Sequence, residues 1–463
     1  MKVLINKLPS DESLGGTLEL ELSGSQVSIG GFMEWEGSRA TIKLIVDPNS
    51  EIYADFLPEF AISINGRYLH PREIGSVAYF RSSVGNMTLL QMGEPFLKAF
   101  TVGQPVEAKF YPRFVLSNYV HPQDVRTPSC AKAQIGGLTQ WAHGSYVARP
   151  LDLSTTADGD SPYLEVTLRT RGYKPVEYCL DGVTIEISSM VVPERDRNTD
   201  ALAVVFHPMV EVNFNQKGKW SDFVETMLHL QDLVNLLSWR NFTPSLLHVA
   251  YEGYASSGQR SWIRVFNSNF EGPENVDIVN RYRFAMPIES LSSEILSVWL
   301  MKRAEHAHAL ELILQVIRAP QMSYEVQALQ LGAGIEAIGY KLFSREIGEE
   351  KADKRRALAL FHRVSRDARR IFPAEFKDWA ANANEIYQAM KHMSRTRPST
   401  GLVAEVNDRS TLAIQIWLAS TLGANDHEIR EYVEASPRLT STYARVPDPS
   451  ELGGGHAGDI HAV

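Results

Sequence analysis

Four cationic or titratable side chains gather where a helical pattern runs into a proline. The stretch YQAMKHMSRTRP, residues 387–398, contains Lys391 and His392, followed by Arg395 and Arg397. A neutral imidazole can accept the proton of an RNA 2′-hydroxyl, and a nearby cation can stabilise the charge that builds up on the phosphate. The residue types therefore suit metal-independent RNA cleavage, and a solvated helix end is the alternative interpretation.

A second Arg–His pair, Arg356 with His362, lies in the basic stretch EKADKRRALALFHRVSRDARR at 350–370. Such spacings arise by chance in any arginine-rich helix, so a solvated helix face is the competing interpretation. The formal net charge of the chain is −9, which argues against broad, non-specific binding of nucleic acid over the whole surface. Any RNA is therefore expected in the C-terminal half, where this basic stretch lies.

Common metal and small-molecule sites are not indicated by the sequence. His306 and His308 in EHAHALE are two residues apart, so on a helix they point to nearly opposite sides and cannot chelate one ion. The zinc spacings His-Glu-x-x-His and Cys-x-x-Cys, the Walker and Rossmann glycine loops and the Gly-x-Ser-x-Gly elbow are all missing. We expect neither a metal nor a cofactor.

Cysteine usage and hydropathy indicate the compartment. Cys130 and Cys179 are too few for a disulfide framework, which fits a reducing environment. No apolar run approaches the roughly 20 residues of a membrane span, and the apolar segment near the N-terminus is too short for a signal peptide. We expect a cytoplasmic protein without a membrane partner.

The chain is long enough for more than one domain, and the first half alternates apolar and polar residues as strands do. This pattern predicts a mostly antiparallel β-sandwich or barrel-like domain over 1–267, with glycines such as Gly15–Gly16 as turns. One long helix is expected at 221–239, with Asp222 and Glu225 as a start signal and one apolar stripe. The strand stretches are GTLELELSG, ATIKLIVD, FAISINGRYL, SPYLEVTLRT, VTIEISSMVV, LAVVFHPMVEVNF and SWIRVFN, and the stripe is Phe223, Met227, Leu230, Val234 and Leu237.

After a linker at 268–285, helical periodicity predicts a bundle of five or six helices over 286–436. Gly423 and Asn425 are expected to end its last long helix, and the tail at 437–463 has too few apolar residues to pack. The fold class is therefore α+β with several domains. The expected apolar faces are Ile288, Leu291, Ile295, Val298 and Trp299, and, in a helix starting at Ser323, Val326, Leu329, Ala333 and Ile338.

The order of three segments resembles the abortive-infection proteins of the ApeA type. The segments are IGGLTQWAHGSYV at 135–147, VETMLHLQDLVNLLSW at 224–239 and the long stretch from FAMPIESL to IGYKL at 284–342. In the last of these, Trp299, Glu325 and Glu336 stand where the family pattern expects them. The resemblance implies a β-rich sensing domain followed by a helical domain of the HEPN superfamily (higher eukaryotes and prokaryotes nucleotide-binding).

Many proteins of that superfamily are metal-independent ribonucleases with an Arg-Asn-x-x-x-His motif on a late helix. His392 matches the histidine of the motif, whereas Tyr387 and Gln388 occupy the places of arginine and asparagine. The resemblance thus implies His392 as the general acid/base, with Lys391 and Arg395 as phosphate contacts. The remaining implied residues are Glu336, which would orient the cations, and Asn384 and Arg397, which would contact RNA.

Two functions follow as alternatives. In the first, the β-rich domain senses a phage or host protein or ligand, and a homodimeric HEPN-like bundle cleaves or binds RNA in antiviral defence. In the second, the protein is a non-catalytic binding module whose degenerate bundle serves only for dimerisation, which the Tyr387–Gln388 replacement favours.

Overall fold

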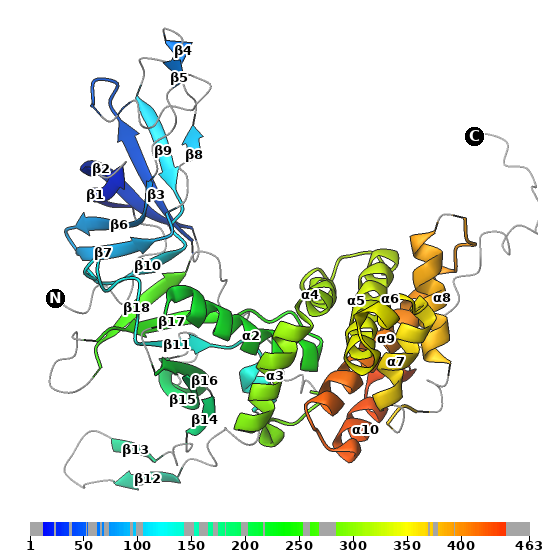
Figure 1. Cartoon of the computed structure of the whole chain (residues 1–463). Coiled ribbons are helices and arrows are strands. Elements are labelled where there is room, and N and C mark those ends of the chain that lie inside the picture. Colours follow the sequence, from blue (N-terminus) through cyan, green and yellow to red (C-terminus); the bar gives the residue numbers. More distant parts are fainter. Residues whose placement is uncertain are drawn as a thin grey trace, which may run out of the picture. The chain divides into compact units, whose positions relative to one another are not determined.

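A computed structural model describes residues 13–440 with interruptions, the longest of which are 54–62, 143–151, 157–164, 253–259 and 268–283. The chain forms two compact units (Figure 1). The first, here called the β unit, comprises Met1–Thr139, Tyr146–Leu228 and Thr243–Val276. The second, the helical unit, comprises Gln140–Ser145, His229–Phe242 and Asp277–Val463. Helix α2, Trp220–Ser238, therefore begins in the β unit and ends in the helical unit.

One antiparallel sheet of fourteen strands organises the β unit. Its order is β14-β15-β16-β11-β17-β18-β10-β7-β6-β1-β2-β3-β9-β8, which has two ends, so the sheet is open rather than closed into a barrel. The strands are β1 Leu14–Leu22, β2 Ser25–Glu36, β3 Arg39–Val46, β6 Ile74–Ser82, β7 Gly85–Leu90, β8 Phe96–Lys98, β9 Val106–Phe110, β10 Phe114–Leu116, β11 Cys130–Gln134, β14 Val176–Leu180, β15 Val183–Arg195, β16 Leu202–Phe214, β17 Ser245–Ala250 and β18 Trp262–Asn267.

Every predicted strand stretch contains a strand, which confirms the α+β class. Two of the stretches contribute to antiparallel pairs that are separate from the fourteen-stranded sheet, β4 Ser63–Ile64 with β5 Arg67–Tyr68 and β12 Asp152–Thr156 with β13 Glu165–Arg169. The expected turn at Gly15–Gly16 is wrong, because both residues lie inside β1. A Cβ atom on Gly16 would lie 2.4 Å from the carbonyl oxygen of Arg81, so glycine there permits close approach of β6 rather than a turn.

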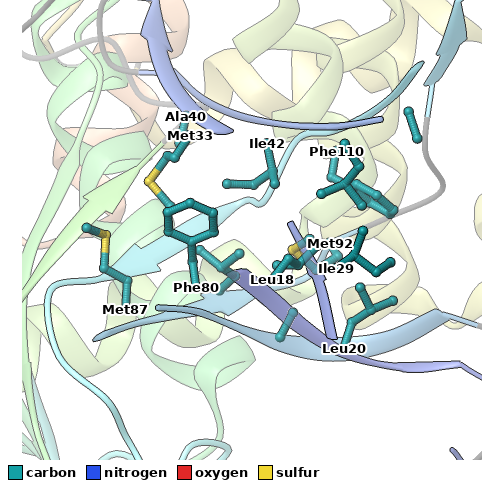
Figure 2. Packing of buried hydrophobic residues seen from close by; sticks show 14 of the residues in the cluster. Leu18, Leu20, Ile29, Met33, Ala40, Ile42, Phe80, Met87, Met92 and Phe110 are labelled. Carbon is teal, nitrogen blue, oxygen red and sulfur yellow. The ribbon is translucent and has the colours of Figure 1, made fainter. Parts of the chain in front are cut away.

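Alternate side chains of the sheet form the core of the β unit. Figure 2 shows apolar side chains from β1, β2, β3, β6, β7 and β9 packed together, as the period of two along a strand requires. This alternation is the physical origin of the sequence pattern. The labelled residues are Leu18, Leu20, Ile29, Met33, Ala40, Ile42, Phe80, Met87, Met92 and Phe110, none more than 8% exposed.

Helix α2 has the predicted apolar stripe, since all five residues of the stripe are buried. It begins at Trp220, one residue before the predicted start at 221. The Asp222 carboxylate lies in the first turn and accepts a hydrogen bond from the backbone N–H of Lys219 at 2.8 Å. Asp222 therefore plays the role of the acidic third residue of a capping box, not of its first residue.

The C-terminal half of α2 is held by side chains of the helical unit. The Trp299 indole donates to the carbonyl of His229 at 2.9 Å. The buried Gln415 amide donates to the carbonyls of Leu236 and Leu237 at 3.1 and 3.0 Å, which satisfies acceptors that a helix end leaves unpaired. The Tyr432 hydroxyl in turn donates to Gln415 at 2.8 Å.

The rest of the helical unit is a bundle (Figure 1). It is divided into more segments than the predicted five or six, because His306, Gly348 and Leu422 interrupt helical runs. After α1, Leu138–Trp141, the helices are α3 Ser293–Glu305, α4 Ala307–Arg318, α5 Tyr324–Ile347, α6 Glu349–Asp353, α7 Ala357–Ala368, α8 Trp379–Lys391, α9 Thr400–Thr421, α10 Asp426–Glu434 and α11 Pro437–Thr440.

The long helices α5 and α9 both contribute buried residues to the core of the helical unit. Ser323 caps α5 as predicted, but the buried face is Ala328, Leu331, Ile335 and Ile338, and Val326 of the predicted face is 42% exposed. Upstream, Ile288, Leu291 and Trp299 of the predicted face are buried, while Ile295 and Val298 are half-buried.

The end of α9 follows one of the two capping predictions. Gly423 follows the helix at φ +85°, in the left-handed region that favours glycine. Asn425, in contrast, caps the start of α10, where its side chain accepts from the backbone N–H of His427 at 2.8 Å.

The predicted boundaries fall largely outside the described residues. Of the linker 268–285, residues 268–283 lie outside, and of the tail 437–463, residues 441–463 do. Residues 437–440 form α11, so the described chain extends four residues into the predicted tail. The division into 1–267 and 286–436 stays a prediction. None of the described helices combines the length and apolarity needed to cross a bilayer.

Candidate functional site

Helix α8 carries the candidate site at its C-terminal end. Trp379, Ala383, Ile386 and Tyr387 bury one face of the helix, and this face fixes how the helix is rotated. The helix ends at His392, whose φ of −120° and ψ of 112° are extended. Cations at such an end lie next to the unpaired carbonyl groups and the negative pole of the helix dipole.

The structure brings Lys391, His392, Arg395 and Arg397 together in one exposed stretch of chain. The backbone N–H of Arg395 donates to the carbonyl of His392 at 3.1 Å, so the chain turns directly after the helix. Within the described residues, no carboxylate forms an ion pair with any of these four side chains. The stretch can therefore offer cationic donors and one imidazole to an anion from solvent.

Glu336 of α5 does not contact these cations directly. Its carboxylate accepts a hydrogen bond from the Tyr387 hydroxyl at 2.7 Å, and the Lys391 ammonium lies 3.5 Å from the same hydroxyl oxygen. Glu336 thus reaches Lys391 through Tyr387. Sequence reasoning treated Tyr387 only as a missing arginine. The available signal was its position four residues before Lys391, on the same face of the helix.

Tyr387 is fixed by close packing. Only 5% of the residue is exposed, and a Cβ atom on Gly332 would lie 2.4 Å from its ring, so glycine at 332 makes room for the tyrosine. Burial raises the pKa of Tyr387, and the hydrogen bond to Glu336 and the charge of Glu336 raise it further. The phenol therefore stays protonated and acts as a donor to Glu336.

Asn384 lies on α8 two turns before Lys391 and is half-buried. Its side-chain oxygen is buried and has no hydrogen-bond partner among the described residues. A role of Asn384 in contacting RNA stays a prediction.

The alternative pair, Arg356 and His362, is not brought onto one face. Both are exposed, but Arg356 precedes α7 and His362 lies on its second turn, six positions later in the sequence. That spacing corresponds to about 240° around a helix. The neighbouring Arg363 and Arg366 are already paired with Glu346. Desolvation would raise the pKa of Glu346, but the hydrogen bonds and charges of Arg363 and Arg366 together outweigh it and lower that pKa.

A second group of cations in the helical unit is tied to a buried carboxylate. Asp232, on the C-terminal half of α2, is 3% exposed. It accepts from Arg303 of α3 and Arg318 of α4, each at 2.9 Å, and Arg318 also pairs with Glu311 at 2.7 Å. We call this group the Asp232 cluster. Its carboxylates occupy the donors that an RNA phosphate would need.

His306 is a buried histidine at the break between α3 and α4. Its ring packs edge-on against Trp417, with the ring centroids 5.3 Å apart, and the described residues offer neither of its nitrogens a hydrogen bond. Burial lowers its pKa to about 4, with Glu305 opposing this and Lys302, Arg345 and Lys341 adding to it. His308 is exposed, so the two histidines lie in different environments, and His306 lies at a break rather than inside one helix as predicted. Across the described residues, no group of three or more potential metal ligands is present.

Comparison with known proteins identifies one family. The family model described as ApeA N-terminal domain 1 matches residues 22–299, which is more than half of the chain. The matched region contains all of α2 and ends at Trp299, whose indole contacts His229. No curated protein and no solved structure matches.

Proposed function

The chain belongs to the ApeA N-terminal domain 1 family, and on that premise we propose that it is an abortive-infection defence protein whose helical unit acts on RNA. The family suggests the defence role. The observation that supports action on RNA is the exposed end of α8, which carries Lys391, His392, Arg395 and Arg397. Among the described residues, no carboxylate forms an ion pair with these four side chains.

The chemistry proposed for this end needs no metal. The imidazole of His392 takes the proton of a 2′-hydroxyl, the 2′-oxygen forms a bond to phosphorus, and the bond from phosphorus to the 5′-oxygen breaks. The leaving oxygen takes a proton from an imidazolium or from water, and a 2′,3′-cyclic phosphate remains. Lys391, Arg395 and Arg397 hold the negative charge of the phosphate as it grows.

A homodimer through the helical unit would strengthen such a site. One exposed turn encloses a phosphate poorly, whereas two turns related by a two-fold axis double the donors around it. The β unit would bind the trigger, a phage or host protein or ligand. We therefore place recognition in the β unit and RNA chemistry in the helical unit.

The test is RNA cleavage by the His392→Ala variant in the presence of a chelator. We expect the rate to fall by about 10²–10⁴-fold, the range for loss of a general acid or base. The melting temperature and the mass in solution should stay the same, because His392 is exposed. His362→Ala, which removes another exposed histidine of the bundle, is the matched control and should cleave normally. Full cleavage by His392→Ala, or loss of wild-type cleavage with chelator, would overturn the mechanism.

A second candidate function is RNA or protein binding without cleavage. It is favoured by Tyr387, which stands where an arginine would hold the phosphate but is buried and hydrogen-bonded to Glu336. In that case the wild-type protein shifts labelled RNA in an anisotropy titration yet yields no product. His392→Ala would then change only the affinity.

A further inference from the structure

We propose that Tyr387 is a positioning residue that holds the Lys391 ammonium at the exposed end of α8 and, with Glu336 behind it, replaces a direct ion pair. The functional consequence rests on the proposed action on RNA. The geometry itself stands on the contacts among Glu336, Tyr387 and Lys391.

The hydroxyl of Tyr387 makes two different contacts at once. It has a single proton, and this proton is directed to Glu336 at 2.7 Å. The lone pairs of the oxygen are then left for a donor, and the Lys391 ammonium lies 3.5 Å away, at the long end of the hydrogen-bond range. Glu336 therefore determines which way the tyrosine oxygen faces the lysine.

The ring of Tyr387 adds a second restraint on the same ammonium. The Lys391 nitrogen lies 5.2 Å from the centroid of the ring, within the distance of a cation–π contact. The ring cannot easily turn away, because it packs against Gly332 and its centroid lies 6.0 Å from that of Phe361. The flexible four-carbon stem of Lys391 is thereby restricted at its charged end.

The arrangement leaves the lysine available to a ligand. An ammonium has three N–H donors, and a contact with a neutral phenol uses one of them. A carboxylate in the same place would neutralise the charge of the lysine, as Glu346 does for Arg363. With Glu336 one group further back, Lys391 is oriented and keeps two donors for a phosphate oxygen.

The experiment is a double-mutant cycle on RNA affinity, with Tyr387→Phe and Lys391→Met as the two changes. Tyr387→Phe keeps the ring and removes the oxygen, and we expect it to raise the Kd for single-stranded RNA about 3- to 10-fold. In the Lys391→Met background the same change should have no further effect, because Tyr387 acts through Lys391. Tyr387→Phe should change the melting temperature by the same amount in the wild-type chain and in the Lys391→Met chain.

A second measurement does not depend on RNA. In protein whose lysines carry ¹³C-labelled N-methyl groups, the aromatic ring should displace the Lys391 signal from that of exposed Lys354. This displacement should change in Tyr387→Phe, which keeps the ring but frees the ammonium from the hydroxyl. If wild-type protein fails to bind RNA, the proposed function falls, and this spectrum still decides the positioning role.

The proposal is overturned by either of two results. One is an equal loss of affinity on Tyr387→Phe with and without Lys391, and the other is a wild-type Lys391 signal that already coincides with that of Lys354. Should Tyr387→Phe not fold, Glu336→Leu removes the acceptor that orients the hydroxyl. It must then show the same dependence on Lys391.

Discussion

The helical unit holds cationic side chains in two contrasting settings, the Asp232 cluster and the exposed end of α8. In the cluster, Arg303 and Arg318 converge on one carboxylate that is 3% exposed, and Arg318 also pairs with Glu311. At the end of α8, His392, Arg395 and Arg397 are exposed, and among the described residues Lys391 is held by a phenol rather than by a carboxylate.

The difference shows that the number of cations in a stretch is a poor guide to function. The basic stretch at 350–370 has more positive charge than the end of α8, yet its Arg363 and Arg366 form ion pairs with Glu346. A cationic surface can bind a phosphate only when its N–H donors are not already paired with a carboxylate from another helix. Stability and function should therefore respond in opposite ways in the two settings.

The largest effect on stability is expected from Asp232→Ala. It leaves the guanidinium of Arg303, whose side chain is 12% exposed, without its main partner, and breaking a buried ion pair in this way costs about 3–5 kcal/mol. Urea denaturation of the full chain measures the loss. Glu350→Ala, which breaks the exposed pair with Lys354, is the control and should leave the denaturation midpoint unchanged. A similar midpoint for both variants would mean that the Asp232 cluster does not hold α2, α3 and α4 together.

A smaller effect, dependent on pH, is expected from His306. The folded pKa of about 4 lies below the usual 6.5, so the unfolded chain binds the extra proton between these values. The stability associated with neutral His306 is complete above pH 6.5 and is lost as the pH falls toward 4, by about 3 kcal/mol in total. The difference in unfolding free energy between wild type and His306→Phe, measured across this range, should show that slope. A difference that does not vary with pH would show that His306 does not titrate there.

The smallest effect on stability is expected from Arg395→Ala and Arg397→Ala. Neither side chain has a partner among the described residues, so the melting temperature should not change measurably. RNA affinity should fall instead, and the slope of log K against log salt should decrease by about one for each lost phosphate contact. Titrations at several salt concentrations measure this slope. A clear fall in melting temperature would assign these arginines to the fold and remove the contrast with Asp232.

The sequence was sufficient where one periodic signal dominates. Alternation revealed the strands, and the spacing of Phe223, Met227 and Leu230 revealed the buried face of α2. The sequence was insufficient to predict the role of a residue whose surroundings are formed by segments distant in the sequence. Gly16 looks like a turn until β6 is placed beside it, and the apolar Val326 looks buried until α5 is packed in the bundle.

The candidate site divides in the same way. Lys391, His392, Arg395 and Arg397 are neighbours in sequence, so their grouping was predictable. The contact of Tyr387 with Glu336 joins residues 51 positions apart, and Gly332 allows it by leaving room for the ring. In the sequence, Tyr387 only replaces the arginine of a motif. The packing of α8 on α5 is needed to show that Tyr387 contacts Lys391, the residue before His392.

The course of α2 limits how this protein can be recombined with its relatives. The helix starts in the β unit, yet its last ten residues supply Asp232 and the carbonyls that Gln415 caps in the helical unit. A graft that exchanged the helical part after residue 242 would therefore separate Arg303, Arg318 and Gln415 from the helix to which they are fitted. Exchange of the β-rich part within the family should succeed only when α2 is inherited together with α3, α4 and α9, so that the unit of inheritance begins inside the β-rich half of the gene.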